Sequence, residues 1–190
     1  MARLLAFGGS LRRDSWNQKL VRIAAGGARS AGAEVTEIAL RDYPLPVFDQ
    51  DLEVEAGLPE SALRLKELFR SHDGLLLACP EYNSSITAAL KNTIDWVSRR
   101  APGEEPLACF SGKVAVLMSA SPGALGGLRG LVHVRAILGN IRVLVLPDQV
   151  AVSGAHEAFQ ENGALKDPQR QAAVENLGRE LARVTARLHG

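Results

Sequence analysis

Short apolar runs alternate with longer segments of helical period along this chain, and the alternation constrains the fold more than any other feature. Five such runs are long enough to be strands: 3–7, 34–39, 75–79, 114–119 and 142–146. Strands that alternate with helices in this way pair in parallel, because each helix carries the chain back across the sheet. The pattern predicts one three-layer α/β domain over residues 1–190, with helices on both faces of the sheet.

The segments between these runs predict the helices and the loops. Apolar residues recur at helical spacing in five segments, which are 15–30, 59–71, 86–97, 128–138 and 167–188. A long proline-containing loop is expected over 41–57 and a polar loop over 99–112. The last strand is expected to end at Pro147, which leaves 147–166 as a connecting loop.

Charge and cysteine content exclude several broad classes of protein. The 22 lysines and arginines nearly balance the 21 aspartates and glutamates, giving a net charge of +1, whereas a nucleic-acid-binding domain normally carries a basic excess. The only cysteines, Cys79 and Cys109, form no C-x-x-C pair and are expected to be reduced thiols. No apolar run approaches the roughly 20 residues of a membrane span. The expected location is therefore the cytoplasm, with neither nucleic acid nor a membrane as a partner.

The loop at 8–17 follows the first strand and opens the first helix. In open parallel sheets, ligands bind beyond the carboxyl ends of the strands, and a helix N-terminus there directs free N–H groups at the ligand. Ser10, Arg12, Ser15 and Asn17 add hydroxyl, guanidinium and amide groups that can hydrogen-bond a phosphate. A helix cap beside a solvated charge explains the same residues, so composition alone leaves both interpretations open.

Two more loops lie at the same edge of the predicted sheet. Residues 80–85 offer backbone N–H groups for a flat heterocycle and the ring of Tyr82 for stacking, although a proline-initiated turn capped by Ser85 is the simpler alternative. Residues 119–127 are rich in serine and glycine, which permits close backbone approach or merely a flexible turn. Three such loops at one edge favour a ligand cleft.

The sequence lacks the short motifs that identify several other classes of enzyme. It contains no G-x-x-x-x-G-K-[ST] phosphate loop, no G-x-G-x-x-G after the first strand, no G-x-S-x-G and no H-E-x-x-H. The four histidines are scattered, so no metal site is expected. No residue is assigned as a catalytic acid or base.

Three motifs resemble those of the NAD(P)H-dependent FMN reductases, a family of flavodoxin-like fold that includes quinone, azo-dye and chromate reductases. Residues 9–20 are similar to the family's G-S-x-R-x-x-S-x-N-x-x-L loop, residues 80–96 to its P-E-Y-N…L-K-N-x-x-D-W segment, and residues 119–129 to its S-x-S-x-G-x-x-G-G-x-R segment. Residues 43–51 also resemble its second-strand loop. Thr87 and Ala88 depart from the proline and glycine that many members carry. The resemblance implies the strand order 2-1-3-4-5.

The resemblance also implies which residues bind FMN. Those matching the first motif would hold the phosphate: Ser10, Leu11, Arg12, Ser15 and Asn17. Those matching the second would line the isoalloxazine ring and ribityl chain: Pro80, Glu81, Tyr82, Asn83 and Ser84. Ser119 and Gly123 would close the opposite side.

The implied activity is ping-pong oxidoreduction. NADPH or NADH would pass hydride to bound FMN, and a quinone, azo compound, free flavin or metal oxyanion would then take the electrons. The alternatives are a flavodoxin-type electron carrier, which the net charge of +1 argues against, a flavin-binding sensor without NAD(P)H turnover, and an enzyme of the same fold with another phosphate ligand. The natural acceptor, the choice between NADPH and NADH, and the tightness of FMN binding stay open.

The family resemblance further implies a homodimer or homotetramer. The segment 86–98, with Lys91, Asp95 and Trp96, is the expected interface, against the alternative that Trp96 packs within its own domain. A second set of side chains either contacts a partner or the nicotinamide phosphate, or forms a solvated helix face: Arg129, His133 and Arg135.

Overall fold

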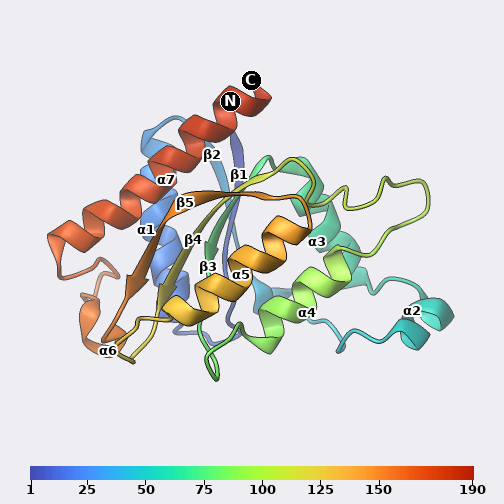
Figure 1. The fold of residues 1–190 in the computed structure, drawn as a ribbon, viewed down its shortest axis with the longest axis horizontal. Helices are drawn as coiled ribbons and strands as arrows, with labels where there is room; N and C mark the ends of the chain where they lie inside the picture. Colours follow the sequence, from blue (N-terminus) through green and yellow to red (C-terminus); the bar gives the residue numbers. More distant parts are fainter.

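A five-stranded parallel sheet forms the middle layer of the protein in the computed structural model, which describes residues 1–190 (Figure 1). The strands are β1 (Arg3–Gly8), β2 (Glu34–Ala39), β3 (Gly74–Ala78), β4 (Val114–Ala120) and β5 (Leu144–Val152). Their order, β2-β1-β3-β4-β5, is the predicted one. Both faces of the three central strands are covered, and accordingly β3 and β4 are buried along their whole length.

Helices cover the sheet on both sides, as predicted. One layer consists of α1 (Trp16–Ser30) and α7 (Pro168–His189), and the other of α3 (Glu60–Ser71), α4 (Ala88–Val97) and α5 (Leu128–Asn140). Alternate residues of each strand contribute to two separate apolar clusters, so that Leu4 and Leu76 pack on the first layer whereas Leu5 and Leu75 pack on the second. None of these helices combines the length and hydropathy needed to cross a membrane.

Two predicted loops contain short helices. The segment 41–57 includes the end of a 3-10 turn, Leu40–Asp42, and the helix α2 (Gln50–Ala56), whose first turn is capped by the Asp49 carboxylate accepting from the Asp51 N–H at 2.9 Å. The segment 147–166 includes α6 (Ala155–Ala158). Both were missed because α2 has no buried residue and α6 is a single turn, so neither shows an apolar period.

The prediction that the last strand ends at Pro147 is wrong. Strand β5 continues to Val152, and its register with β4 shifts between the pairs Ala115–Val145 and Leu117–Gln149. Pro147 lies inside this bulge on the edge strand, where a missing N–H removes no bond from the ladder. The Arg135 guanidinium donates to the carbonyls of Leu146 at 2.9 Å and of Pro147 at 3.3 Å, which satisfies acceptors that the bulge leaves free.

The prediction that Trp96 serves an interface is also wrong. Its side chain is fully buried within its own domain. The indole N–H donates to the Pro46 carbonyl at 2.8 Å, and the Phe48 ring packs edge-on at a centroid distance of 5.0 Å. Trp96 therefore anchors the segment between β2 and α2 to α4, while Lys91 and Asp95 form an exposed i,i+4 ion pair.

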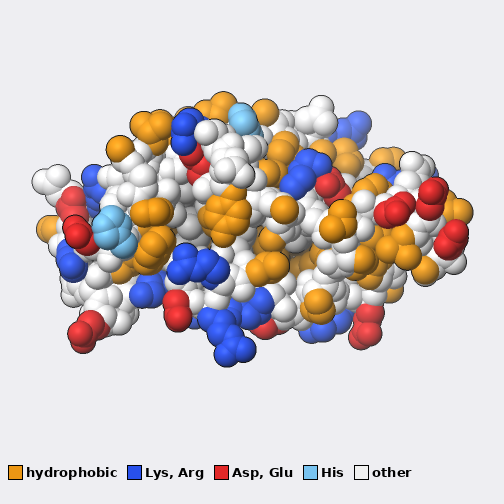
Figure 2. Space-filling view, turned by 90° about the horizontal axis from the view of Figure 1, so that it is seen from below, with side chains coloured by type: hydrophobic (Ala, Val, Ile, Leu, Met, Phe, Trp, Pro, Cys, Tyr) orange, Lys and Arg blue, Asp and Glu red, His pale blue; other side chains and the backbone are white.

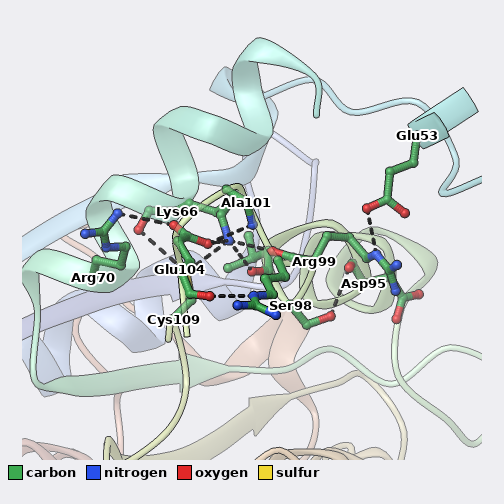
Figure 3. Close-up of polar contacts among 11 residues, drawn as sticks. Glu53, Lys66, Arg70, Asp95, Ser98, Arg99, Ala101, Glu104 and Cys109 are labelled. Atoms are coloured by element: carbon green, nitrogen blue, oxygen red, sulfur yellow. Dashed lines mark hydrogen bonds and ion pairs between the residues drawn. The ribbon is translucent and has the colours of Figure 1, made fainter. Parts of the chain in front are cut away.

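The C-terminal end of α4 is fixed by a buried ammonium group (Figure 3). Lys66, on α3, is 4% exposed, and its Nζ donates to the Arg99 carbonyl at 2.6 Å and lies 2.8 Å from the Glu104 carboxylate. Burial alone raises the pKa of Glu104, but hydrogen bonds from Lys66 and the Ala101 N–H outweigh it, so that this pKa lies below its ordinary value. The network ties α3 and the 99–112 loop to the helix whose other end reaches the candidate site.

Candidate functional site

The N-terminus of α1 lies at the carboxyl end of β1 and forms one wall of a polar cavity. Ser15 is the helix cap, with its hydroxyl accepting from the Gln18 N–H at 3.4 Å. The N–H groups of Trp16 and Asn17, in the first turn, have no acceptor within the chain. The Arg12 guanidinium lies over the Trp16 ring, 5.1 Å from its centroid, and has no carboxylate partner. The loop therefore presents free N–H groups and an unpaired arginine to the polar cavity, an arrangement that favours an anion.

Asn17 connects this loop to the end of β4. Its side chain is 3% exposed, and its amide exchanges two hydrogen bonds with the backbone of Ala120, at 2.8 Å and 2.9 Å. Thr87 makes the corresponding connection to α4, since its hydroxyl donates to the Gly9 carbonyl at 2.5 Å and accepts from the Leu90 N–H. The two side chains therefore hold the loop rigidly between its neighbours.

Residues 80–85 form a tight turn after β3. The backbones of Tyr82 and Ser85 exchange two hydrogen bonds of 3.0 Å, and Asn83 and Ser84 between them both have positive φ, 50° and 65°. The N–H groups of Asn83 and Ser84 have no acceptor in the chain, and the Tyr82 side chain is 51% exposed. The turn thus presents free backbone donors beside an exposed aromatic ring.

Glu81 binds this turn to α5. Its carboxylate receives Nε and Nη2 of Arg129 at 2.9 Å and 2.5 Å and the Gly130 N–H at 3.1 Å. Burial raises the pKa of Glu81, but the hydrogen bonds from Arg129 and Gly130 outweigh that effect and hold the pKa below its ordinary value. A second contact joins the Ser85 hydroxyl to His133 Nδ1 at 2.8 Å. Arg129 and His133 therefore position the turn.

The third predicted loop contributes different residues from those expected. Ser119 is completely buried, and its hydroxyl has no hydrogen-bond partner. It lies under Gly127, where a Cβ atom would come within 2.0 Å of the Ser119 Oγ. Gly127 also has a φ of 92°, so both the backbone conformation and the lack of space for a Cβ atom require glycine there. Gly123 is exposed and outside the cavity walls, whereas Ser121 and Pro122 line the polar cavity.

Two adjoining cavities occupy the space between these loops. The polar one, of about 320 Å³, lies between the α1 N-terminus, the 80–85 turn and the end of β4. The other, of about 380 Å³, has mostly apolar walls and lies between the same turn, the first loop and the start of α4. Ser10, Arg12 and Tyr82 line both cavities. The pair can hold a phosphate at one end and a flat ring at the other.

The structure brings most of the predicted site residues together. Eight of them line one or both cavities: Ser10, Leu11, Arg12, Ser15, Asn17, Pro80, Glu81 and Tyr82. The other four line neither cavity: Asn83, Ser84, Ser119 and Gly123. Sequence reasoning missed Trp16, Thr87 and Ala88 as wall residues. The sequence distinguishes Thr87 and Ala88 only because they depart from the family motif, and that signal does not place them in a cavity wall.

Together, the parallel sheet and this cleft define a flavodoxin-like protein with a polar cavity at the α1 N-terminus and an apolar cavity beside it. The chain belongs to the NADPH-dependent FMN reductase family, whose model matches residues 2–157. It is accordingly an oxidoreductase of a family that uses FMN and NAD(P)H.

Relatives of similar length support this membership. An NAD(P)H-dependent FMN reductase of Pseudomonas aeruginosa is 35% identical over 190 residues, covering 99% of this chain and 97% of its own. A quinone reductase of Pseudomonas putida is 36% identical over 167 residues, which are 85% of this chain and 83% of its own. Among solved structures, the flavoenzyme NAD(P)H:(acceptor) oxidoreductase FerB of Paracoccus denitrificans has a TM-score of 0.81 at 26% identity, with 98% of both chains covered.

Proposed function

We propose that this protein binds FMN in the two adjoining cavities and catalyses its reduction by NADPH or NADH, followed by electron transfer to a small acceptor in a ping-pong cycle. The acceptor classes are those that the family resemblance implies: a quinone, an azo compound, free flavin or a metal oxyanion. The observation that carries the proposal is the continuity of a polar cavity at a helix N-terminus with an apolar cavity beside a turn of free N–H groups.

The residues of the two cavities fit FMN. The free N–H groups of Trp16 and Asn17 and the guanidinium of Arg12 suit the phosphate, because a helix N-terminus and an unpaired arginine both favour a dianion. The free N–H groups of Asn83 and Ser84 suit the carbonyl and nitrogen edge of a flavin. The side chain of Asn17 would act mainly by positioning the loop, because its amide group already forms two hydrogen bonds with the backbone of Ala120.

FMN, when bound, supplies the ring that accepts hydride and releases electrons. The protein's own part is to bind and orient it. Thr87 and Asn17 fix the phosphate loop, and the Glu81–Arg129 ion pair fixes the turn. Ser119 is buried beneath Gly127. It therefore packs behind the cavity wall and does not line the cavity itself.

The visible absorption spectrum of the purified protein with FMN tests this proposal. Anaerobic NADPH or NADH should bleach the bound flavin, and a quinone should restore its colour. Flavin that binds but is not bleached by either nucleotide would favour the electron carrier or sensor. If no flavin binds even in excess, the phosphate-loop argument fails.

A matched pair of arginine variants locates the phosphate. We expect Arg12→Ala to weaken FMN binding about tenfold, as expected for one charge-assisted hydrogen bond. Arg13→Ala removes the same charge from the neighbouring exposed position, which lines neither cavity, and should change the FMN affinity less than about twofold. Fluorescence titration of FMN measures both.

We further propose that the protein is a homodimer or homotetramer, located in the cytoplasm in keeping with its two free, buried cysteines. Leu128 and Val132, one turn apart on α5, are 41% and 59% exposed and form an apolar stripe outside the core. The stripe lies on the helix that holds the 80–85 turn. Light scattering gives the mass in solution, and Val132→Asp should lower it if α5 is the interface.

A further inference from the structure

A third cavity, of about 260 Å³, lies beside the apolar cavity on the side of the segment that follows β2. It shares Leu11 and Ala89 with the apolar cavity, so the two are neighbours separated by the exposed Leu11 side chain. Leu40, Pro44 and Leu45 supply much of its wall. Pockets that hold a whole small ligand usually exceed about 300 Å³, so this cavity suits one end of a molecule whose remainder lies in the cleft.

Arg41 is the only charged residue that lines this cavity. Asn92 uses its side-chain oxygen on the Phe48 N–H and its amide N–H on the Pro46 carbonyl, both at 2.8 Å. Thr93 donates to the Ala89 carbonyl at 2.9 Å. The half-buried Arg41 makes one hydrogen bond, from Nη2 to the Arg12 carbonyl at 2.5 Å, and has no carboxylate partner. Most of its five N–H donors are therefore free.

The surroundings of Arg41 favour an anion. Arg12 and Arg64 also have no carboxylate partner, and their guanidinium groups lie over the rings of Trp16 and Tyr43 at 5.1 Å and 4.8 Å from the centroids. Asp42, the acidic neighbour of Arg41, lines a different cavity. Figure 2, which views the lower face of Figure 1, shows Lys and Arg side chains beside exposed apolar ones near its lower centre, with some Asp and Glu side chains among them.

We infer that the third cavity receives the adenosine end of the pyridine nucleotide, and that Arg41 binds one of its phosphate groups. The inference rests on the proposed function, which places the flavin ring in the neighbouring apolar cavity, so that the nicotinamide must reach that ring from outside. An elongated molecule with a flat ring at each end and phosphates between them can reach from the flavin ring to the third cavity, where Arg41 has free donors. A neutral quinone would leave the Arg41 charge without a partner.

Anaerobic stopped-flow reduction of the FMN-loaded protein tests this assignment with two donors. NADPH carries the adenosine end, whereas reduced nicotinamide mononucleotide lacks it. In Arg41→Ala, we expect the NADPH concentration for half-maximal bleaching to rise about tenfold, the effect of one charge-assisted hydrogen bond. With FMN kept saturating, the limiting rate and the response to the mononucleotide should stay unchanged. Arg13→Ala, which removes an equal charge outside the cavity, should change each value less than about twofold.

A direct binding measurement separates the site from the reaction. Adenosine 2′,5′-bisphosphate should bind the oxidised, FMN-loaded protein in calorimetry, and Arg41→Ala should weaken that binding about tenfold, with Arg41→Lys intermediate. Equal effects of Arg41→Ala on both donors, or an effect on the quinone alone, would overturn the inference and assign the cavity to the ring or to the acceptor. If flavin binds and neither donor bleaches it, the proposed function fails as well.

Discussion

Replacing Lys66 with methionine tests the energetic role of the buried network in Figure 3. Methionine keeps most of the volume but leaves the Arg99 carbonyl without its donor and removes the closest cation from Glu104, whose side chain is 11% exposed. Removing one partner of a buried pair costs about 3–5 kcal/mol. Because Arg70 still lies 3.2 Å from Glu104, we expect the lower end, about 3 kcal/mol.

Thermal and urea unfolding measure this loss. For a chain of this size, about 3 kcal/mol corresponds to roughly 6–12 °C in Tm. Lys91→Met is the matched control, because the exposed Lys91–Asp95 pair should contribute less than about 0.5 kcal/mol. Equal stabilities of the two variants would refute the reasoning.

The pH dependence of the same network has a defined sign. The pKa of Glu104 lies below 4.5, its value in an unfolded chain. Its contribution to stability is therefore complete above about pH 4.5 and is lost as the pH falls through the lowered pKa of the folded state. The stability difference between wild type and Glu104→Gln should shrink over that range, whereas a constant difference would show that the charge is not responsible.

Three further predictions concern the site and the core. Gly127→Ala should destabilise the protein by about 3 kcal/mol and weaken FMN binding, because it combines a positive φ with a collision against Ser119. Urea unfolding and FMN titration measure the two effects, and unchanged values would contradict the prediction. Asn17→Ala should cost about 2–3 kcal/mol in the same unfolding assay, because the buried N–H and carbonyl of Ala120 lose their partners. Burial raises the pKa of the Cys79 thiol to about 12, so iodoacetamide at pH 8 should leave it unmodified in the native protein, as mass spectrometry will show.

The sequence predicts the sheet and the position of the loop 8–17 before α1 well because both depend on local patterns. Continuous apolar runs indicate β3 and β4, and Ser15 caps α1, which is the helix-cap interpretation of this loop. The strand order itself came from the family resemblance, since no local signal fixes which strands are neighbours.

Contacts between distant residues account for what could not be predicted. The amide of Asn17 binds a backbone 103 positions away, and the indole of Trp96 binds one 50 positions away, so neither partner can be deduced from spacing. A motif likewise suggests that Ser119 faces a ligand, but its burial depends on where Gly127 packs.

The bulge at Pro147 has a consequence for association between molecules. An edge strand with free carbonyls and N–H groups can template the addition of a strand from another chain. In β5, Pro147 removes one donor, and the Arg135 guanidinium already occupies the carbonyls of Leu146 and Pro147. At these two residues the edge cannot form regular ladder hydrogen bonds with a strand of another molecule, which disfavours growth of the sheet along that side.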